Sequence, residues 1–321
     1  MLCVLLPTMI LAADGWTTLE TVGQPTARHE AACVGFQNKI YLIGGRRINP
    51  VDEFDPATKH WTAKSPTPLE LHHFQAVVLG NRIYLMGAMT GPYPNEKPLE
   101  RIITYLPTED RFEMLGAIPA DRRRGGAGAA VYQGKIYLVG GITNGHVGGF
   151  RPWFDEYDPE TGSWRKLPDA PNARDHFQAV VIGDRLYAPA GRHTSQGTGD
   201  VFNLTIEQID VYDFKSGDWL PENECPKLPT QRAGNMAIAI DGKLVVGGGE
   251  SSNQNTAHDE VEVYNPKLDS WTKLADLNRG RHGSGFVHFD RYLYTASGCG
   301  NRGGSPELQS IERLELPINT P

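Results

Sequence analysis

The 321-residue sequence lacks long hydrophobic runs, has no excess of basic residues and contains only four cysteines. Its longest apolar run extends from Leu2 to Ala13, which is shorter than the roughly 20 residues needed to cross a bilayer as a helix. The formal net charge of −7 argues against a general nucleic-acid binder, because such a protein needs a basic surface to displace counterions from phosphates. We therefore expect no membrane span and no nucleic acid among its partners.

The apolar run ends in small residues and resembles the core and cleavage site of a secretory signal, although the usual basic segment before it is absent. We predict a signal peptide at residues 1–13 and a secreted or periplasmic location. If the run is instead an extra strand or follows a misassigned start codon, the location is cytoplasmic. Removing residues 1–13 would leave Cys33, Cys225 and Cys299, an odd number that cannot form a fully paired disulfide framework. Whether Cys225 and Cys299 pair stays open, because both fall in expected loops.

Glycine, proline and an internal repeat are abundant. The 36 glycines and 23 prolines are spread along the chain, which indicates many tight turns and favours an all-β protein. Six related segments combine an aliphatic stretch with following small residues: KIYLIGG at residue 39, RIYLMGA at 82, KIYLVGG at 135, RLYAPAG at 185, KLVVGGG at 243 and YLYTASG at 292. Their period of about 50 residues predicts a repeat architecture.

A second marker has the same register. Two aromatic residues seven positions apart follow five of the six segments, at Phe54/Trp61, Tyr105/Phe112, Tyr157/Trp164, Tyr212/Trp219 and Tyr264/Trp271. The residues between them, such as DPATKH and DPETGS, are typical of a short turn between two strands. Each unit is therefore predicted to be a four-stranded antiparallel meander. The nearly identical stretches HFQAVVLG at 73 and HFQAVVIG at 176 begin units two and four.

The last unit lacks its outer strand at the C-terminal end, because no Trp follows SIERLELP. The stretch around Trp16 resembles the outer strands of other units, so an N-terminal strand can complete the last unit and close a ring. The glycine pairs, the Tyr-to-Trp spacing and the repeat length resemble the kelch β-propeller family from Trp16 to Pro317, although unit two has Gly87-Ala88 and Phe112 at these positions. We predict an all-β, six-bladed kelch β-propeller with four-stranded antiparallel blades, built as a single domain over residues 14–321.

The predicted connections are long on one face of the propeller, after strand two, and tight on the other. Variable insertions on one face of a repeat array usually mark the binding face. A position that begins the innermost strand of each unit also falls on this face and is occupied by Arg28, Leu71, Arg124, Arg174, Arg232 and Arg281. Guanidinium groups there can bind carboxylates or phosphates of a ligand. Alternatively, they bind backbone carbonyls of a neighbouring blade and have a structural role.

Polar residues that break the repeat gather beside this ring of arginines. They include His29, His72, His73, Asp175, His176, Asn235 and Glu250, and the loops add His146, Arg151, Trp153 and His258. The mixture suits a polar or acidic ligand in a shallow funnel. The predicted ligand-binding residues are Arg28, Arg46, Arg124, Arg174, Arg192, His193, Arg232, Arg281 and His282.

No motif identifies an enzyme or a cofactor. We expect no metal site, because His72 and His73 should point to opposite sides of a strand, and no residues match the copper ligands of the galactose oxidase group. HGSGF at 282 and RRGGAGAA at 123 lack the strand-to-helix context of a nucleophile elbow or a phosphate loop. The resemblance to kelch propellers leaves one catalytic possibility, a sugar epimerase or mutarotase acting on an acidic sugar such as a sialic acid. His73, His176 or Glu250 would then be the acid or base, with the arginines as the clamp.

The preferred hypothesis is a non-catalytic propeller that recognises an acidic carbohydrate or an acidic protein segment on the long-loop face. A structural module that assembles through the outer blade edges is a third possibility. The sequence leaves the oligomeric state open.

Overall fold

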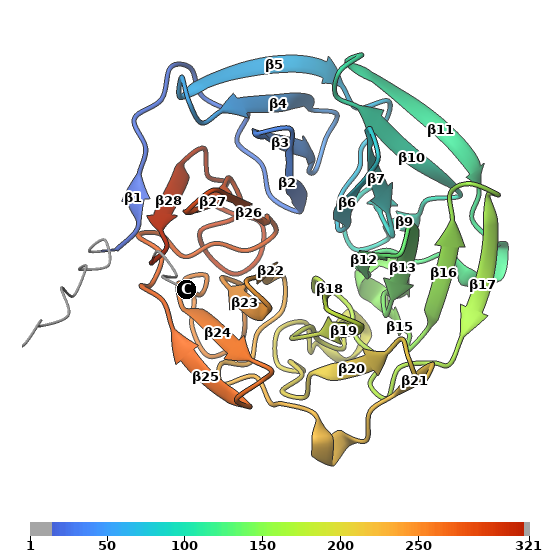
Figure 1. The fold of residues 1–321 in the computed structure, drawn as a ribbon. Coiled ribbons are helices and arrows are strands. Elements are labelled where there is room, and N and C mark those ends of the chain that lie inside the picture. The colour runs from blue at the N-terminus through green and yellow to red at the C-terminus, as the bar shows by residue number, and fades with distance from the viewer. Residues whose placement is uncertain (1–14, 318–321) are drawn as a thin grey trace, which may run out of the picture.

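The computed structural model describes residues 15–317, which form six four-stranded antiparallel sheets arranged as blades around a central axis (Figure 1). This confirms the predicted all-β, six-bladed propeller with four-stranded blades. The predicted signal peptide at residues 1–13 lies outside the described residues. Within residues 15–317 no helix is long and apolar enough to cross a bilayer.

The strands of each blade follow one another from the propeller axis outward. From the innermost strand, blade 1 contains β2 (Ala31–Phe36), β3 (Lys39–Gly44), β4 (Pro50–Asp55) and β5 (His60–Pro66). Blade 2 contains β6 (Gln75–Leu79), β7 (Arg82–Met86), β10 (Arg101–Leu106) and β11 (Arg111–Ala117). Blade 3 contains β12 (Gly128–Tyr132), β13 (Lys135–Val139), β16 (Phe154–Asp158) and β17 (Ser163–Leu167).

The second half of the chain repeats this order. Blade 4 contains β18 (Val180–Ile182), β19 (Arg185–Ala188), β20 (Asp210–Asp213) and β21 (Asp218–Trp219). Blade 5 contains β22 (Met236–Ile240), β23 (Lys243–Gly247), β24 (Val261–Asn265) and β25 (Ser270–Lys273). Blade 6 contains β26 (Phe286–Phe289), β27 (Tyr292–Ala296), β28 (Ile311–Glu315) and β1 (Thr17–Thr18).

The repeated aromatic pairs hold the outer half of each blade. Their members lie directly opposite each other on strands three and four, as Tyr157 and Trp164 do on β16 and β17. The centroids of these two rings are 5.0 Å apart, and the corresponding rings of Tyr264 and Trp271 are 5.2 Å apart. Aromatic cross-strand pairs stabilise a sheet through close side-chain packing. The seven-residue spacing is therefore the distance from one strand to its partner around a short turn.

The N-terminal strand closes the ring, as the sequence predicts. Thr17 and Thr18 of β1 pair with Arg313 and Glu312 of β28 in antiparallel register. Trp16 is buried and stacks on Phe286, and its indole Nε1 donates a hydrogen bond to a backbone carbonyl of blade 5 at 2.9 Å. Blade 6 is thus assembled from both ends of the chain, and closure satisfies the backbone groups of the outer edge of β28.

The twin HFQAVV stretches connect blades through their glutamines. Gln75 of blade 2 accepts hydrogen bonds from the backbone amides of Ala129 and Ala179 at 2.8 Å each and donates to the Ala179 carbonyl. Gln178 of blade 4 makes the same kind of bridge to Ala237 of blade 5 and to the carbonyl of Ser284. The repeated sequence therefore supplies cross-links from one blade to the next blade and to the one after it, at the propeller centre.

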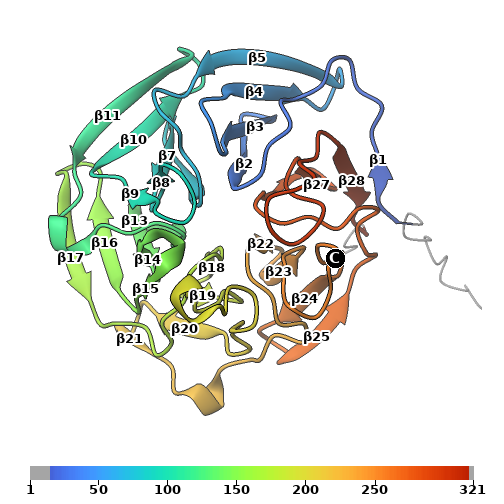
Figure 2. The ribbon, with the colours of Figure 1, turned by 180° about the vertical axis from the view of Figure 1, so that it is seen from behind.

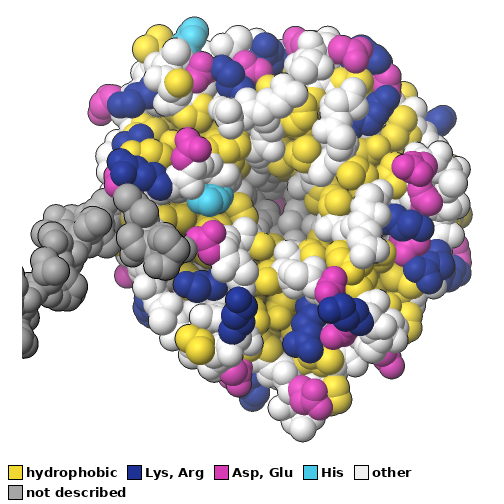
Figure 3. Space-filling view, viewed as in Figure 1, with side chains coloured by type: hydrophobic (Ala, Val, Ile, Leu, Met, Phe, Trp, Pro, Cys, Tyr) yellow, Lys and Arg dark blue, Asp and Glu magenta, His cyan; other side chains and the backbone are white. Residues whose placement is uncertain are grey.

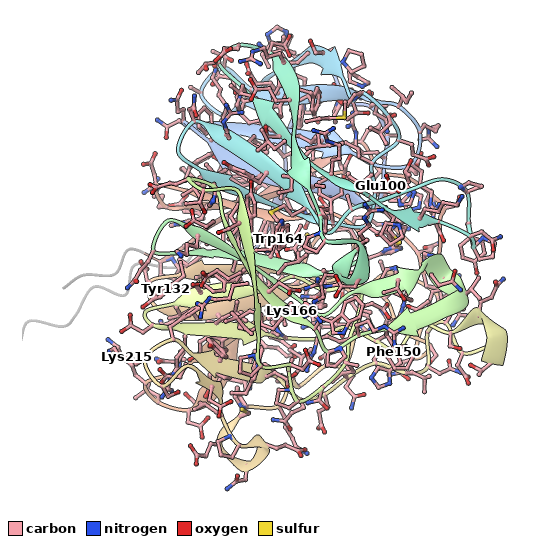
Figure 4. The ribbon with its side chains drawn as sticks, turned by 90° about the vertical axis from the view of Figure 1, so that its right-hand side faces the viewer. Glu100, Tyr132, Phe150, Trp164, Lys166 and Lys215 are labelled. Carbon is pink, nitrogen blue, oxygen red and sulfur yellow. The ribbon has the colours of Figure 1, made fainter. Side chains whose placement is uncertain are left out.

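The two faces differ as predicted from loop length. The long connections after strand two form small hairpins and turns on the face shown in Figure 2: β8 (Met89–Thr90) with β9 (Lys97–Pro98), β14 (Ile142–Asn144) with β15 (Gly148–Phe150), η2 (Gly145–Val147) and η3 (Gln196–Thr198). The short helices η1 (Ala120–Arg122) and η4 (Glu222–Glu224) connect successive blades. Figure 4 shows Phe150 and Glu100, from the long connections, on one side of the propeller and Tyr132 and Lys215 on the other.

The opposite face, formed by the tight turns, is hollowed at its centre and shows many hydrophobic side chains around the opening (Figure 3). Alanine and valine residues of the innermost strands line this hollow. Cys33, Cys225 and Cys299 are free thiols, so the described residues contain no disulfide.

Candidate functional site

A ring of backbone hydrogen bonds surrounds the propeller axis where the innermost strands begin. It involves one equivalent residue from each blade: Glu30, His73, Gly126, His176, Gly234 and Gly283. The amides of five of these residues donate to the carbonyl of the equivalent residue in the preceding blade, at 2.6–3.0 Å, and the amide of Ala31 closes the ring on Gly283 at 3.2 Å. The ring fixes the backbone at this level of the axis.

All six residues of this backbone ring adopt left-handed conformations, with φ between 54° and 64°. Glycine adopts such values at little cost, and three of the six positions are glycine. Glu30, His73 and His176 are not, and holding a non-glycine residue in this region costs about 1 kcal/mol or more. Such strain is typical of positions where a side chain is needed for function. We take these three residues as the floor of the candidate site: Glu30 and His73 line the cavity described next, and His176 lies beside His73.

A funnel-shaped cavity of about 780 Å³ lies on the long-loop face above this floor. Glu30 and His73 line its base, and the loops supply an upper wall that includes Arg46, Tyr93 and Phe202. Tyr93 is half exposed, which leaves its ring free to contact a ligand. The structure thus places a polar cavity with aromatic side chains on the face that the loop lengths predict.

A network of buried charges lines the centre of the funnel. Glu250 accepts hydrogen bonds from Arg192 Nη1 at 2.5 Å and from the Gly303 amide at 2.7 Å. His282 lies between Glu250 and Glu30, with nitrogen-to-oxygen distances of 3.4 and 3.5 Å. Burial alone would lower the pKa of His282, but the two carboxylates raise it well above its ordinary value. His282 is therefore a cation held between two anions at neutral pH.

A second polar cluster forms the wall that contains Arg46. The Glu96 carboxylate accepts hydrogen bonds from Arg46 Nη2 at 2.7 Å and from His146 Nδ1 at 2.9 Å. Burial would raise the pKa of Glu96, but these two partners lower it to about 2. Among the described residues, Arg46 makes no other side-chain hydrogen bond, so its Nε and Nη1 donors are free to bind a ligand.

The prediction that His72 and His73 point to opposite sides of a strand is wrong. Their rings touch, and the two Nδ1 atoms are 2.7 Å apart. His73 has a φ of 54°, so the alternation of side chains along a strand does not apply at this position. Burial lowers the pKa of His72 to about 4 and that of His73 well below its ordinary value, so both rings are neutral at pH 7.

The five arginines at the start of the innermost strands do not line the funnel. Each side chain is almost completely buried and pairs with a carboxylate on the third strand of its own blade: Arg28 with Asp52, Arg124 with Asp155, Arg174 with Asp210, Arg232 with Glu262 and Arg281 with Glu312. Arg174, for example, also donates to the carbonyls of Ala188 and Ala190 at 2.7 Å each. These carbonyls belong to the same blade, and not to a neighbouring one.

Blade 2 has neither member of this ion pair. Leu71 replaces the arginine, and Ile103 stands where the third strand of other blades has the carboxylate. Both side chains are buried in one hydrophobic cluster. A buried ion pair can be exchanged for apolar residues of similar volume with little change in stability, whereas a lone buried charge is unfavourable. The joint replacement favours the structural role for the five arginines.

The other predicted site residues differ in their position relative to the funnel. Arg46, Arg192, His282, His73 and Glu250 line the funnel, together with His29. His176 lies beneath it, next to His73, with ring centroids 4.8 Å apart. His193 instead stacks on Phe150 and bonds to the Ala173 carbonyl, and it does not line the funnel.

Sequence reasoning missed Glu30, Glu96, Tyr93, Arg47, Glu307 and Phe202. A signal for Glu30 is present in the alignment of the units, since three of the six equivalent positions are glycine and only Glu30, His73 and His176 have side chains there. No repeat position marks Glu96 or Tyr93, because both lie in a loop that has no counterpart of equal length in other blades.

Comparison with known proteins agrees with the fold and the repeat. The family described as Attractin/LZTR1 beta-propeller matches residues 8–251, and the Kelch motif matches residues 232–278. Kelch-like protein terF of Aspergillus terreus is 28% identical over 313 residues, which cover 89% of this chain and 65% of that protein. Beta-scruin of Limulus polyphemus is 26% identical over 83% of this chain and 29% of its own length.

A solved structure, titled "Structure of YjhT", superimposes with a TM-score of 0.74 and 16% sequence identity, covering 90% of this chain and 95% of that one. This likeness concerns the fold. The chain spans less than two thirds of the length of Kelch-like protein terF and of Beta-scruin. The kelch propeller fold suggests a role in binding other molecules, although a fold alone does not specify the ligand. The family matches and the six registered blades show that the chain belongs to the kelch-repeat β-propeller family.

Proposed function

We propose that the protein binds an acidic carbohydrate in the funnel on its long-loop face. The observation on which the proposal rests is the arrangement of Arg46 and Tyr93 in the same cavity as the buried carboxylates of Glu30 and Glu250. Arg46 offers two free guanidinium donors for an acidic group, and Tyr93 offers an exposed ring for the apolar face of a sugar. The volume of about 780 Å³ is within the range of small-molecule sites.

The charges favour a sugar with one acidic group over an acidic protein segment. Arg46, Arg47 and Arg192 are already paired with Glu96, Glu307 and Glu250, at 2.7, 2.6 and 2.5 Å. Their positive charges are therefore largely compensated, and a peptide with several carboxylates would be repelled by the remaining acidic groups of the funnel. Sugar hydroxyls, in contrast, can donate hydrogen bonds to those carboxylates.

The test is a binding titration with N-acetylneuraminic acid, glucuronic acid, glucose and a polyglutamate peptide. We expect saturable binding of an acidic sugar, and a loss of about tenfold or more in Arg46→Ala, because a hydrogen bond to a charged group contributes about 1.5–3 kcal/mol. Arg82→Ala is the matched control, since Arg82 is also partly exposed with a carboxylate partner, Glu113, but lies outside the funnel. Binding of polyglutamate alone, or equal loss in both variants, would contradict the proposal.

A sugar epimerase or mutarotase is the second candidate. The observation that favours it is the contact of the cationic His282 with Glu250, whose pKa is lowered because His282 and Arg192 outweigh the effect of burial. The pair thus offers a proton donor and an ionised base at the funnel base. NMR exchange spectroscopy on an acidic sugar should then show faster anomeric exchange with the wild type than with Glu250→Gln. Equal exchange rates with and without protein would remove this candidate.

A further inference from the structure

Three histidine rings from different blades converge beneath the funnel. His73 and His176 come from the backbone ring around the axis, and His146 comes from η2 in the long connection of blade 3. The ring centroids are 4.8–5.0 Å apart for all three pairs, and each side chain is buried. One nitrogen from each ring lies within 4.8 Å of the other two.

The Nδ1 atoms of two of these rings are occupied by carboxylates. His146 Nδ1 bonds to Glu96 at 2.9 Å, and His176 Nδ1 bonds to Asp175. A carboxylate with two acceptor oxygens places the imidazole proton on Nδ1. The Nε2 atoms of His146 and His176 therefore have lone pairs when the rings are neutral. A histidine held by a carboxylate in this way is a common arrangement at metal centres.

The third ring is oriented by another histidine. His72 Nε2 lies 3.1 Å from the carbonyl of Gly91, which can only accept, so His72 has its proton on Nε2. His72 Nδ1 must then accept the hydrogen bond from His73 Nδ1, 2.7 Å away. His73 Nε2 then has a lone pair and lies 3.4 Å from a carboxylate oxygen of Glu30, an arrangement that a cation between the two would stabilise. Hydrogen bonding thus uses Nδ1 of all three rings and leaves Nε2 as the nitrogen of each ring that can bind an ion.

Buried imidazole nitrogens with lone pairs need a hydrogen-bond donor or a metal ion as a partner. His176 Nε2 is buried and has no hydrogen-bond partner among the described residues. The buried His258 shows the usual alternative: its Nδ1 bonds to Glu260 at 2.9 Å, and its Nε2 bonds to the Ser251 hydroxyl at 2.8 Å. Both nitrogens of His258 are satisfied by protein groups, whereas His176 Nε2 is not, and an unsatisfied buried polar atom is unfavourable.

We propose that His73, His146 and His176 form a binding site for a divalent transition metal ion. Three neutral imidazoles suit zinc, copper, iron or nickel, and exclude the hard ions that prefer oxygen ligands. With zinc–nitrogen bonds of about 2.0–2.1 Å, tetrahedral ligands lie about 3.3 Å apart, so the three nitrogens need to move together by about 1 Å. His73 and His146 also line the funnel, and a fourth ligand can therefore come from the funnel. This inference rests on the histidine geometry and not on the proposed sugar ligand.

Zn²⁺ and Co²⁺, each added without any sugar, are the probes for this site. Full-length protein that has been treated with a chelator and dialysed is titrated with Zn²⁺ against a competing chelating dye, and with Co²⁺ while visible absorption is recorded. We expect one ion per chain, Co²⁺ bands typical of a four-coordinate nitrogen-rich site, and a higher melting temperature with Zn²⁺. No sugar is present, so failure of this test leaves the proposed sugar binding untouched.

The variants separate the site from adventitious binding by other histidines. His146→Gln changes a loop residue and should lower the Zn²⁺ affinity at least tenfold, because loss even of an orienting partner has an effect of about 10–100-fold. His258→Gln is the matched control and should bind like the wild type. Equal affinities of the His146→Gln variant and the wild type would overturn the proposal. A wild-type Co²⁺ spectrum identical to that of the aqueous ion would overturn it without any variant.

Discussion

Replacing Arg174 by leucine is the sharpest test of what the five buried arginines do. Arg174 Nη2 lies 3.0 Å from Asp210, and its guanidinium group also donates to three backbone carbonyls. Both side chains of the ion pair are at most 2% exposed. Removing one member of a buried ion pair leaves the other charge uncompensated and typically destabilises a protein by about 3–5 kcal/mol. We expect Arg174→Leu to lower the free energy of unfolding by this amount.

Blade 2 supplies the compensating change. Because Leu71 and Ile103 replace the pair there, the double variant Arg174→Leu/Asp210→Ile imitates a natural solution in the same fold. The uncompensated charge is absent in the double variant, so part of the stability should return. Contacting residues typically show coupling energies of about 0.5–3 kcal/mol, and we expect a value in the upper half of this range.

Urea unfolding and thermal melts of these variants measure both quantities. At about 2 °C per kcal/mol for a large domain, Arg174→Leu should melt about 6–10 °C below the wild type. Arg185→Ala is the control in the same blade, since Arg185 pairs with Asp213 at 3.1 Å but is half exposed, and exposed pairs contribute less than about 1 kcal/mol. An unchanged melting temperature for Arg174→Leu, together with weaker ligand binding, would refute the structural role.

Three further predictions concern closure, cross-links and charge. Trp16→Ala should lower the free energy of unfolding by about 3–5 kcal/mol in urea, because a buried aromatic side chain is lost; a change below about 1 kcal/mol would contradict closure by β1. Gln75→Ala should destabilise by about 1–3 kcal/mol, because two backbone amides lose their acceptor, and an unchanged urea midpoint would count against this bridge. The raised pKa of His282 stabilises the fold fully below pH 6.5, and this contribution is lost as pH rises through the folded pKa. The melting-temperature difference between the wild type and His282→Gln should therefore become smaller as the pH is raised. A difference that becomes larger would contradict a raised pKa of His282.

The fold could be predicted from the sequence because its signals are periodic. The segment that forms strand two has the same pattern in every unit and is largely buried, as Lys39–Gly44 is in β3. Each aromatic pair indicates a hairpin of the same length between strands three and four, as Phe54 and Trp61 do. Trp16 identified the missing outer strand because it matched its counterparts in other units. Repetition thus provided several independent copies of the same local evidence.

The candidate site could be predicted only in part, because burial and partners depend on the third dimension. The sequence shows five arginines at one repeat position, but it does not by itself show that each pairs with a carboxylate on the third strand, as Arg174 does with Asp210. Aligning the third strands would have shown that the arginine and the carboxylate are absent together in blade 2. Loop residues such as Glu96 and Tyr93 have no repeated counterpart, so no comparison within the sequence could mark them.

The same symmetry explains where chemistry can arise in this propeller. The backbone ring around the axis needs a left-handed residue in every blade, and glycine at positions 126, 234 and 283 meets this need with the least strain. Glu30, His73 and His176 meet it at a cost in stability, which is compensated by the closed ring of hydrogen bonds and the packed blades around it. Side chains held this rigidly are well suited to bind an ion or orient a ligand, because little conformational entropy remains to be lost on binding. We therefore place the functional groups at the positions where the sequence departs from the repeat at the axis, and not at the repeated arginines.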